Sequence, residues 1–137
     1  LRGMTIDGTL AIRALDELPL CAALAAAAEG TTTIRGAAEL RVKESDRIAA
    51  ACALVRAFGV ACDELPDGLV VHGRGPGALR AAVVHSFGDH RIAMAGAVLA
   101  LAAPGPSVIE DVANVATSFP SFAPSLRALG AALSDPA

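Results

Sequence analysis

The sequence predicts a domain of the α/β or α+β class, in which helices pack against sheets. Helix-like runs alternate with short β-branched runs along the 137 residues, as in domains that cover sheets with helices. The hydrophobic content of 54% is enough for a sizeable core. A helix, a glycine, a strand and a second helix also occur twice, with 75 residues between Gly30 and Gly105 and 71 between Gly59 and Gly130. The chain is therefore predicted to consist of repeated β-α-β-α-β-β units.

The first unit is expected to cover residues 1–73. Its predicted elements, in chain order, are extended structure over 4–14, a helix over 17–28, a strand over 31–35, a helix over 44–58 and a hairpin of strands 60–64 and 69–72. Gly59 suits the C′ position that ends a helix. Asp67-Gly68 marks the turn of the hairpin.

The second unit is expected to cover residues 81–137. Residues 73–80 contain three glycines and a proline and predict a link between the units. The predicted elements are a strand over 81–84, a helix over 91–102, a strand over 107–109 and a helix that ends at Gly130. Ser118-Phe119-Pro120 predicts the start of this last helix, with Ser118 as N-cap and Pro120 in the first turn.

Composition and charge exclude several classes of function. The net charge is −3, aromatic residues make up 3%, and no run rich in lysine or arginine occurs, so a nucleic-acid surface is not expected. The longest apolar runs, 18–28 and 92–104, are shorter than the roughly 20 residues of a membrane-spanning helix, and no signal peptide is visible. The three cysteines lack metal-binding spacing and predict buried thiols in the reducing cytoplasm.

Residues 41–47, Arg-Val-Lys-Glu-Ser-Asp-Arg, are the most highly charged stretch of the chain. Five of the 25 charged residues (11 basic and 14 acidic) lie in these seven positions. In the predicted helix, Lys43, Glu44 and Arg47 share one turn near the N-terminus, where backbone N–H groups favour anions. Two interpretations stay open, a solvated helix start with a Glu44–Arg47 ion pair and part of an anion-binding site.

A second charged cluster, Gly88-Asp89-His90-Arg91, precedes the apolar run 92–103. Asp89 suits the N-cap of the next helix, whereas Arg91 is a cation in its first turn and opposes the helix dipole. Arg91 therefore needs Asp89 or an external anion as its partner. Asp16 also suits an N-cap, before helix 17–28. Two charged helix starts in a chain with few charges favour a site for a small molecule with several negative charges.

Three motifs, in this order, resemble the 5-enolpyruvylshikimate-3-phosphate synthases (3-phosphoshikimate 1-carboxyvinyltransferases): residues 41–47, Gly88-Asp-His-Arg-Ile-Ala-Met94 and Ala116-Thr-Ser-Phe-Pro120. Leu15-Asp-Glu-Leu-Pro19 and Glu29-Gly-Thr-Thr-Thr33 fit this family as well, so the resemblance covers nearly the whole chain. Family members are roughly three times longer and have two similar inside-out barrel domains, each of three β-α-β-α-β-β units. The resemblance therefore implies the C-terminal portion of such an enzyme and a missing N-terminal domain.

The resemblance also implies a reaction in the shikimate pathway, which leads to aromatic amino acids. The family transfers the enolpyruvyl group of phosphoenolpyruvate to the 5-hydroxyl of shikimate 3-phosphate and releases phosphate. The site lies in the cleft between the domains and uses neither metal nor organic cofactor. Asp16 corresponds to the proton acceptor at the 5-hydroxyl, and Glu44 to the acid that protonates the methylene carbon of phosphoenolpyruvate.

The other charged positions correspond to substrate-binding residues. Asp16 and Lys43 correspond to contacts with shikimate 3-phosphate, and Arg47 and Arg91 to the arginines that hold phosphoenolpyruvate. Converging cations suit this reaction, because the two substrates together carry two phosphates and two carboxylates. Asp89 and His90 are expected to support Arg91 and to line the cleft.

One position departs from the family pattern. Thr117 stands where many members carry a lysine, and some branches of the family also lack this lysine.

Two alternatives stay open. The sister transferase that acts on UDP-N-acetylglucosamine shares the fold, but the Lys-Glu-Ser-Asp-Arg and Asp-His-Arg motifs fit the shikimate enzyme better. The chain could also be a fragment that folds and supplies one wall of the cleft without catalysing anything alone. The expected partners are therefore the two small substrates and the missing N-terminal domain, with no nucleic acid and no membrane.

Overall fold

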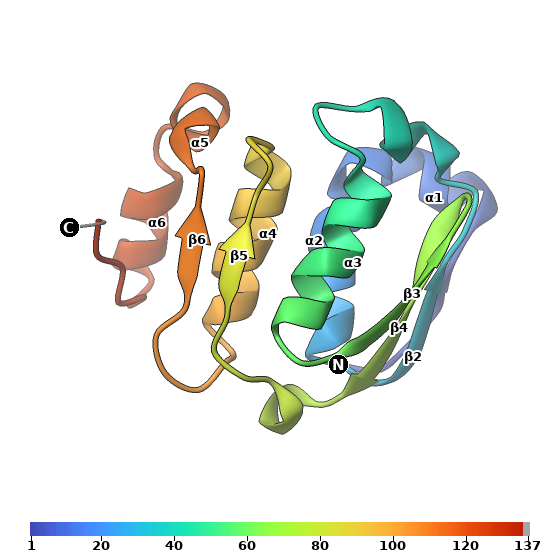
Figure 1. Ribbon diagram of the computed structural model, residues 1–137, viewed down its shortest axis with the longest axis horizontal. Coiled ribbons are helices and arrows are strands. Elements are labelled where there is room, and N and C mark those ends of the chain that lie inside the picture. Colours follow the sequence, from blue (N-terminus) through green and yellow to red (C-terminus); the bar gives the residue numbers. More distant parts are fainter. Residues whose placement is uncertain (136–137) are drawn as a thin grey trace.

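A computed structural model describes residues 1–135, in which helices and strands alternate (Figure 1). The strands are β1 (Thr5–Ile6), β2 (Glu29–Ile34), β3 (Ala61–Leu65), β4 (Gly68–Arg74), β5 (Val83–His85) and β6 (Val108–Glu110). The α-helices are α1 (Gly8–Arg13), α2 (Leu18–Ala26), α3 (Arg47–Ala57), α4 (His90–Ala100), α5 (Ala113–Ser118) and α6 (Phe122–Ala128). Short 3-10 helices are η1 (Leu15–Glu17), η2 (Ala38–Val42) and η3 (Pro76–Ala78). This order confirms the predicted mixed α/β class.

The strands form two sheets. The larger has the order β1-β2-β4-β3, with β1 parallel to β2 and with β4 antiparallel to both β2 and β3. The smaller is the parallel pair β5-β6. In the chain, α2 lies between β1 and β2, and α4 lies between β5 and β6. The two parallel pairs are thus built alike, each from two strands joined through a helix.

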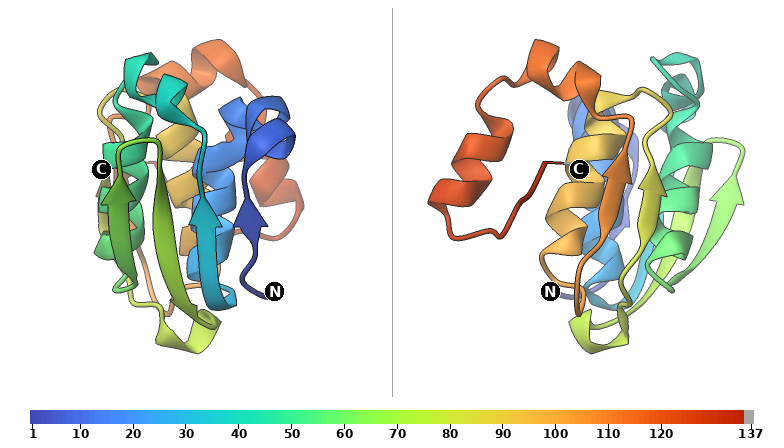
Figure 2. Two further views of the ribbon diagram at one scale, coloured as in Figure 1. Left: turned by 90° about the vertical axis from the view of Figure 1, so that its right-hand side faces the viewer. Right: turned by 60° about the vertical axis from the view of Figure 1, so that its left-hand side comes forward.

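Helices α2, α3 and α4 lie between the two sheets (Figures 1 and 2). The packing is continuous, since α2 contacts α3, α4 and β4, and α4 also contacts β5 and β6. Helix α2 buries Leu18, Ala22, Ala23 and Ala26, and its small side chains let its neighbours come close. No helix within residues 1–135 has both the length and the apolarity to cross a membrane.

Residues 4–14 differ from the prediction of extended structure. Only Thr5 and Ile6 pair with β2, opposite Thr33 and Ile34. Strand β2 ends at Ile34, so no partner remains for the following residues, and α1 begins at Gly8. The alternating side chains of this segment therefore belong mostly to a short helix.

The start of the second predicted helix also differs. The helix α3 begins at Arg47 rather than at residue 44, because the Asp46 side chain caps it by accepting from the Ala49 N–H at 3.1 Å. Lys43 and Glu44 lie in the preceding loop and do not share a helical turn with Arg47. At the other end, Gly59 has φ +88° and confirms the predicted C′ position.

Two further boundaries differ. Strand β4 pairs as far as Arg74, opposite Glu29, and so enters the segment expected as a link. Near the C-terminus, Ser118 ends α5 instead of starting a helix, and Ser121 precedes α6. Phe119 is extended (φ −143°, ψ 77°) because Pro120 follows it, which interrupts the helix there.

The cysteines follow the prediction of buried thiols in part. Cys52 and Cys62 are buried, and their Sγ atoms lie 3.1 Å apart between α3 and β3. Cys21 is half-buried. All three are free thiols.

Candidate functional site

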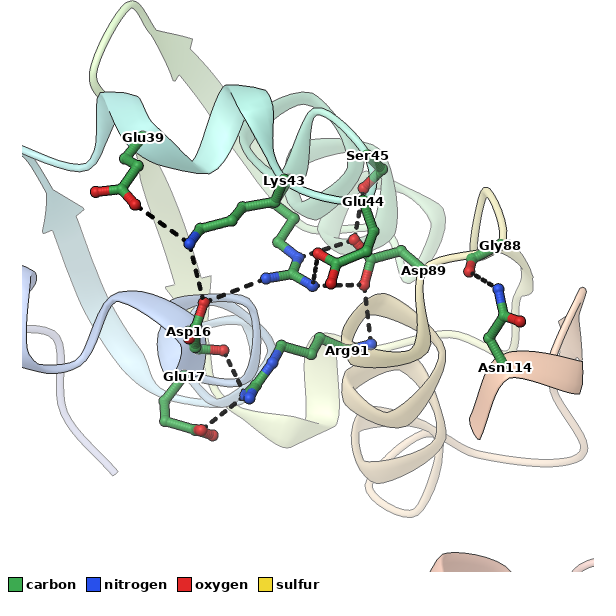
Figure 3. Close-up of polar contacts among 11 residues, drawn as sticks. Asp16, Glu17, Glu39, Lys43, Glu44, Ser45, Gly88, Asp89, Arg91 and Asn114 are labelled. Atoms are coloured by element: carbon green, nitrogen blue, oxygen red, sulfur yellow. Dashed lines mark hydrogen bonds and ion pairs between the residues drawn. The ribbon is translucent and has the colours of Figure 1, made fainter. Parts of the chain in front are cut away.

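The charged motifs meet where α2, α3 and α4 begin (Figure 3). The contributing residues are Asp16 and Glu17 from η1, Glu39 from η2, Lys43, Glu44 and Ser45 from the loop before α3, Arg47 at the start of α3, and Asp89, His90 and Arg91 at the start of α4. Three helix N-termini at one place supply partial positive charge, which favours carboxylates and anionic ligands. The structure therefore brings together segments that are far apart in the sequence.

Arg47 and Asp89 form the base of the site. The guanidinium donates to both carboxylate oxygens, with Nε–Oδ2 at 2.8 Å and Nη2–Oδ1 at 3.2 Å. The side chains are only 2% and 0% exposed. Such a two-point contact is geometrically specific and charge-assisted. It fastens the start of α3 to the start of α4.

Asp89 accepts two more hydrogen bonds, from Ser45 Oγ at 2.8 Å and from the Arg91 backbone N–H at 3.0 Å. The second bond confirms Asp89 as the N-cap of α4. Burial acts to raise the pKa of Asp89, but the hydrogen bonds from Arg47 and Ser45 outweigh it and hold the pKa below the ordinary value. The carboxylate is thereby kept charged in the interior.

The loop between β5 and α4 fixes the position of Asp89. Phe87 and Gly88 both have positive φ angles, 56° and 70°, which fold the chain into a tight turn. The Asp89 N–H donates to the Ser86 carbonyl at 3.0 Å. From α5, Asn114 Nδ2 donates to the Gly88 carbonyl at 2.5 Å. Hydrogen bonds to Ser86 and from Asn114 therefore hold the turn that places the buried Asp89 carboxylate.

Glu44 and Asp16 lie on the open side of Arg47. Glu44 Oε2 is 2.6 Å from Nη2, and Asp16 Oδ1 is 3.4 Å from Nη1. Both carboxylates are about half-exposed, at 56% and 51%. The predicted Glu44–Arg47 pair is therefore present. Asp16 does not cap α2, because Glu17 occupies the N-cap position without a side-chain bond.

Lys43 bridges two carboxylates. Its Nζ lies 3.6 Å from Asp16 Oδ1 and 3.3 Å from Glu39 Oε1. Its side chain is 24% exposed, so solvent reaches the ammonium group. Lys43 and Arg47 thus share Asp16 as a common partner.

Arg91 differs from the expectation that Asp89 or an external anion would neutralise it. Its Nη1 donates to Glu17 Oε1 at 2.7 Å and to the Asp16 backbone carbonyl at 2.8 Å. The Asp89 side chain instead holds Arg47, and contacts Arg91 only through the backbone. Because Asp89 is fully buried, it supports the site from below and does not line an open cleft.

A hollow of about 380 Å³ lies beside Arg91, between α2, α4 and the α5–α6 segment. Its lining residues are Asp16, Glu17, Leu20, His90, Arg91, Met94, Ala95, Val98, Ser118, Phe119 and Phe122. His90 is half-buried and lies in this lining, as expected for a residue near Arg91. Charged groups at one side and apolar side chains at the other suit a small anionic molecule with a carbon skeleton.

Carboxylates outnumber cations in this cluster. Lys43, Arg47 and Arg91 contact five carboxylates, those of Asp16, Glu17, Glu39, Glu44 and Asp89. An anionic ligand must therefore displace carboxylates or bring in further cations. Within residues 1–135, no group of three or more His, Cys, Asp or Glu side chains is arranged to hold a metal.

Three residues of the candidate site were not predicted from the sequence. Glu17 pairs with Arg91, Glu39 pairs with Lys43, and Ser45 donates to Asp89. Glu17 and Ser45 lie inside the charged motifs, so their positions carried a usable signal. Glu39 lies outside them and is placed by η2.

Comparison with known proteins gives one consistent result. A sequence model of the family described as EPSP synthase (3-phosphoshikimate 1-carboxyvinyltransferase) matches residues 5–126. The 3-phosphoshikimate 1-carboxyvinyltransferases of Xanthomonas campestris pv. campestris (strain 8004) and Geobacter sulfurreducens are 52% and 51% identical over 122 residues, 89% of this chain. The alignments cover 27% and 28% of these relatives.

Solved structures agree with the sequence comparison. An EPSP synthase from Acinetobacter baumannii matches 93% of this chain with a TM-score of 0.89 and 37% identity. The match covers 30% of that protein. The chain thus spans less than a third of the length of the relatives it matches.

Proposed function

Because this chain belongs to the EPSP synthase family, we propose that it supplies one wall of an active site that transfers the enolpyruvyl group of phosphoenolpyruvate to the 5-hydroxyl of shikimate 3-phosphate and releases phosphate. The observation that carries this proposal is the convergence of Asp16, Lys43, Glu44, Arg47 and Arg91 at the start of three helices. These are the positions at which the sequence resembles the functional residues of the family. Such a protein is a transferase of aromatic amino-acid biosynthesis and would work in the cytoplasm.

Glu44 and Asp16 are the proposed acid and base. Both carboxylates are half-exposed, and they contact adjacent nitrogens of the same guanidinium, that of Arg47. A substrate placed over Arg47 would therefore reach both carboxylates. Glu44 would protonate the methylene carbon, and Asp16 would accept the proton of the 5-hydroxyl. Two carboxylates in different surroundings can divide these roles.

Arg47 and Arg91 are the proposed phosphoenolpyruvate contacts. In the empty site, Glu44 and Asp16 cover the open side of Arg47, and Glu17 occupies Arg91. Binding would exchange these carboxylates for the anionic groups of the substrate. The freed Glu44 would then lie beside the substrate that it protonates.

The remaining residues would complete this wall. Lys43 is the proposed contact to shikimate 3-phosphate, and His90 lines the hollow beside Arg91. Asp89 would orient Arg47 from below. Five carboxylates against three cations cannot attract two phosphorylated substrates, so the opposite wall must bring the additional cations. We therefore propose the missing N-terminal domain as the structural partner.

We also propose that the chain contains two repeated units, 1–73 and 81–137, with residues 73–80 as the link. The parallel pairs β1-β2 and β5-β6, each joined through a helix, support this division. In this arrangement the first unit contributes Asp16, Glu17 and the charged run before α3 to the site, and the second unit contributes the residues at the start of α4.

The proposed function is tested in an enzyme of full family length that carries this segment. Glu44→Gln keeps the shape of the side chain but removes the proton donor, and turnover is expected to fall by about 10²–10⁴-fold. Phosphate release from the two substrates measures this loss. Glu29→Gln, an exposed carboxylate at the start of β2, serves as the control and should leave turnover unchanged.

Two results would contradict the proposal. Turnover of Glu44→Gln within a few-fold of the parent would remove Glu44 from the chemistry. Activity with UDP-N-acetylglucosamine in place of shikimate 3-phosphate would assign the chain to the sister reaction.

A further inference from the structure

We propose that Arg41 is a positioning residue for this reaction. Its side chain closes the loop that carries Lys43 and Glu44 and anchors this loop to the β3–β4 hairpin. The inference rests on the proposed function, because it concerns the placement of the proposed acid. Arg41 makes no contact with the other charged residues at the start of α2 or α4. Its effect must therefore pass through the loop.

The Arg41 guanidinium makes four hydrogen bonds in three directions. Nη1 lies 2.8 Å from Asp46 Oδ2 and 2.9 Å from Glu64 Oε1. Nε donates to the Pro66 carbonyl at 2.9 Å, and Nη2 donates to the Leu65 carbonyl at 2.6 Å. All three nitrogens are used, and the side chain is 28% exposed. A lysine could not reproduce this pattern, because its donors radiate from one atom.

The contact between Arg41 and Asp46 joins the two ends of the loop. Asp46 uses its other oxygen, Oδ1, to cap α3 through the Ala49 N–H at 3.1 Å. One carboxylate thus holds Arg41 on one side and the start of α3 on the other. The residues enclosed between them include Lys43 and Glu44, which extend toward the site (Figure 3).

The anchor of the loop is itself held in place. The turn of the hairpin consists of Pro66 and Asp67, since Leu65 pairs with Gly68. The Asp67 carboxylate accepts from the Gly36 N–H at 2.9 Å and from Arg35 Nε at 3.2 Å. The turn is therefore tied to the segment that follows β2. Arg41 connects this fixed point to the loop.

Positioning matters here because Lys43 and Glu44 belong to no helix or strand. A displacement of about 1 Å in a reacting group can cost roughly 10²-fold in rate. The ion pairs of Arg41 are partly exposed, and such pairs contribute little to global stability. Loss of Arg41 is therefore expected to affect the loop more than the fold.

The test compares Arg41→Gln with Arg56→Gln in an enzyme of full family length that carries this segment. Arg56 is a matched control, because its Nε and Nη2 donate to the Cys62 carbonyl at 2.9 and 2.5 Å and link α3 to β3 away from the loop. We expect kcat to fall by about 10–10²-fold in Arg41→Gln, with a smaller change in KM, and to stay near the parent value in Arg56→Gln. In a Glu44→Gln background, Arg41→Gln should cause a smaller loss of kcat than in the parent, since the proton donor that it positions is already gone and only Lys43 remains to be placed.

A second measurement follows the loop without using activity. Lys43 is the only lysine among the 137 residues, so a protease specific for lysine cuts this segment only there. Cleavage after Lys43 in the folded enzyme, identified by fragment mass, should be faster in Arg41→Gln than in the parent and in Arg56→Gln. If Arg41→Gln does not fold, Arg41→Lys replaces it in the kinetic test. Its kcat is expected to fall as well, because lysine lacks the planar guanidinium with its three separate nitrogens.

The outcomes separate this inference from the proposed function. An unchanged kcat, an additive loss in the Glu44→Gln background, or equal cleavage rates would each overturn the role of Arg41. A parent enzyme that releases no phosphate from the two substrates would instead overturn the proposed function, while the cleavage comparison would still test the loop.

Discussion

Replacing Asp89 with asparagine tests the buried base of the site. The change removes a negative charge from a side chain that is 0% exposed, while Arg47 beside it is 2% exposed. Asparagine keeps an oxygen that can cap α4 nearly as well as aspartate does. The change therefore spares the capping role of Asp89, and it removes the negative charge together with the acceptor Oδ2, which binds Ser45 Oγ and Arg47 Nε.

The expected cost follows from the contacts that remain. Removing one partner of a buried ion pair costs about 3–5 kcal/mol. Arg47 would retain Glu44 at 2.6 Å and Asp16 at 3.4 Å, so its charge would not be left unpaired. We expect the lower end of the range, about 3 kcal/mol, which is roughly a 100-fold change in the ratio of folded to unfolded chain.

Urea unfolding of the 137-residue chain measures this free energy. The midpoint should fall in Asp89→Asn, and the slope of the transition should stay the same. Asp46→Asn is the matched control, because Asp46 caps α3 in the same way but has a side chain that is 41% exposed. Its cost should not exceed about 1 kcal/mol. Equal costs for the two variants would refute the argument from burial.

The effect should also depend on pH. The pKa of Asp89 is held below its ordinary value, which is about 3.9 in an unfolded chain. A lowered carboxyl pKa contributes stability that is present above the unfolded pKa and is lost as the pH falls through the folded pKa. The difference between the parent and Asp89→Asn should therefore narrow below about pH 4. A difference that stays constant there would contradict the assignment of the shift to Asp89.

Three other predictions concern the charged site and the packing of β4. In an enzyme of full family length, Arg91→Ala should raise the KM for phosphoenolpyruvate more than the KM for shikimate 3-phosphate, since one anion contact is lost; equal increases would contradict this role. The isolated chain should show no calorimetric binding of phosphoenolpyruvate, because its three cations at the site already face five carboxylates; clear binding would show that one wall suffices. Gly73→Ala should destabilise the chain by about 1–3 kcal/mol in urea unfolding, because the added methyl group would overlap the carbonyl oxygens of Ala25 and Ala28; an unchanged midpoint would mean that β4 shifts freely.

The fold class could be predicted from local patterns, and so could the charged segments that come together in the candidate site. Apolar runs followed by glycine mark α3, α4 and α6, and the β3–β4 hairpin follows from its turn residues. The exact start of α3 could not be predicted, because a charged loop before a helix has the same residue pattern as a charged first turn. Only the bond between the Asp46 side chain and the Ala49 N–H decides it.

The ion pairs within the site could not be predicted from local patterns. Arg47 and Asp89 are 42 residues apart, and Arg91 and Glu17 are 74 apart. Each pairing depends on how α2, α3 and α4 pack. Sequence therefore predicted which charged segments carry the candidate site, whereas the pairing of their side chains became visible only in three dimensions.

The ion pair between Arg47 and Asp89 makes the chain suitable for division into two pieces. Arg47 lies before η3 and Asp89 lies after it, so a break at η3 would leave one ion-pair partner on each piece. Reassociation in trans would bring α2 against α4 and rebuild the pair at the same time. The dissociation constant of the two pieces, compared with that of an Asp89→Asn piece, would then measure the contribution of this one contact to assembly.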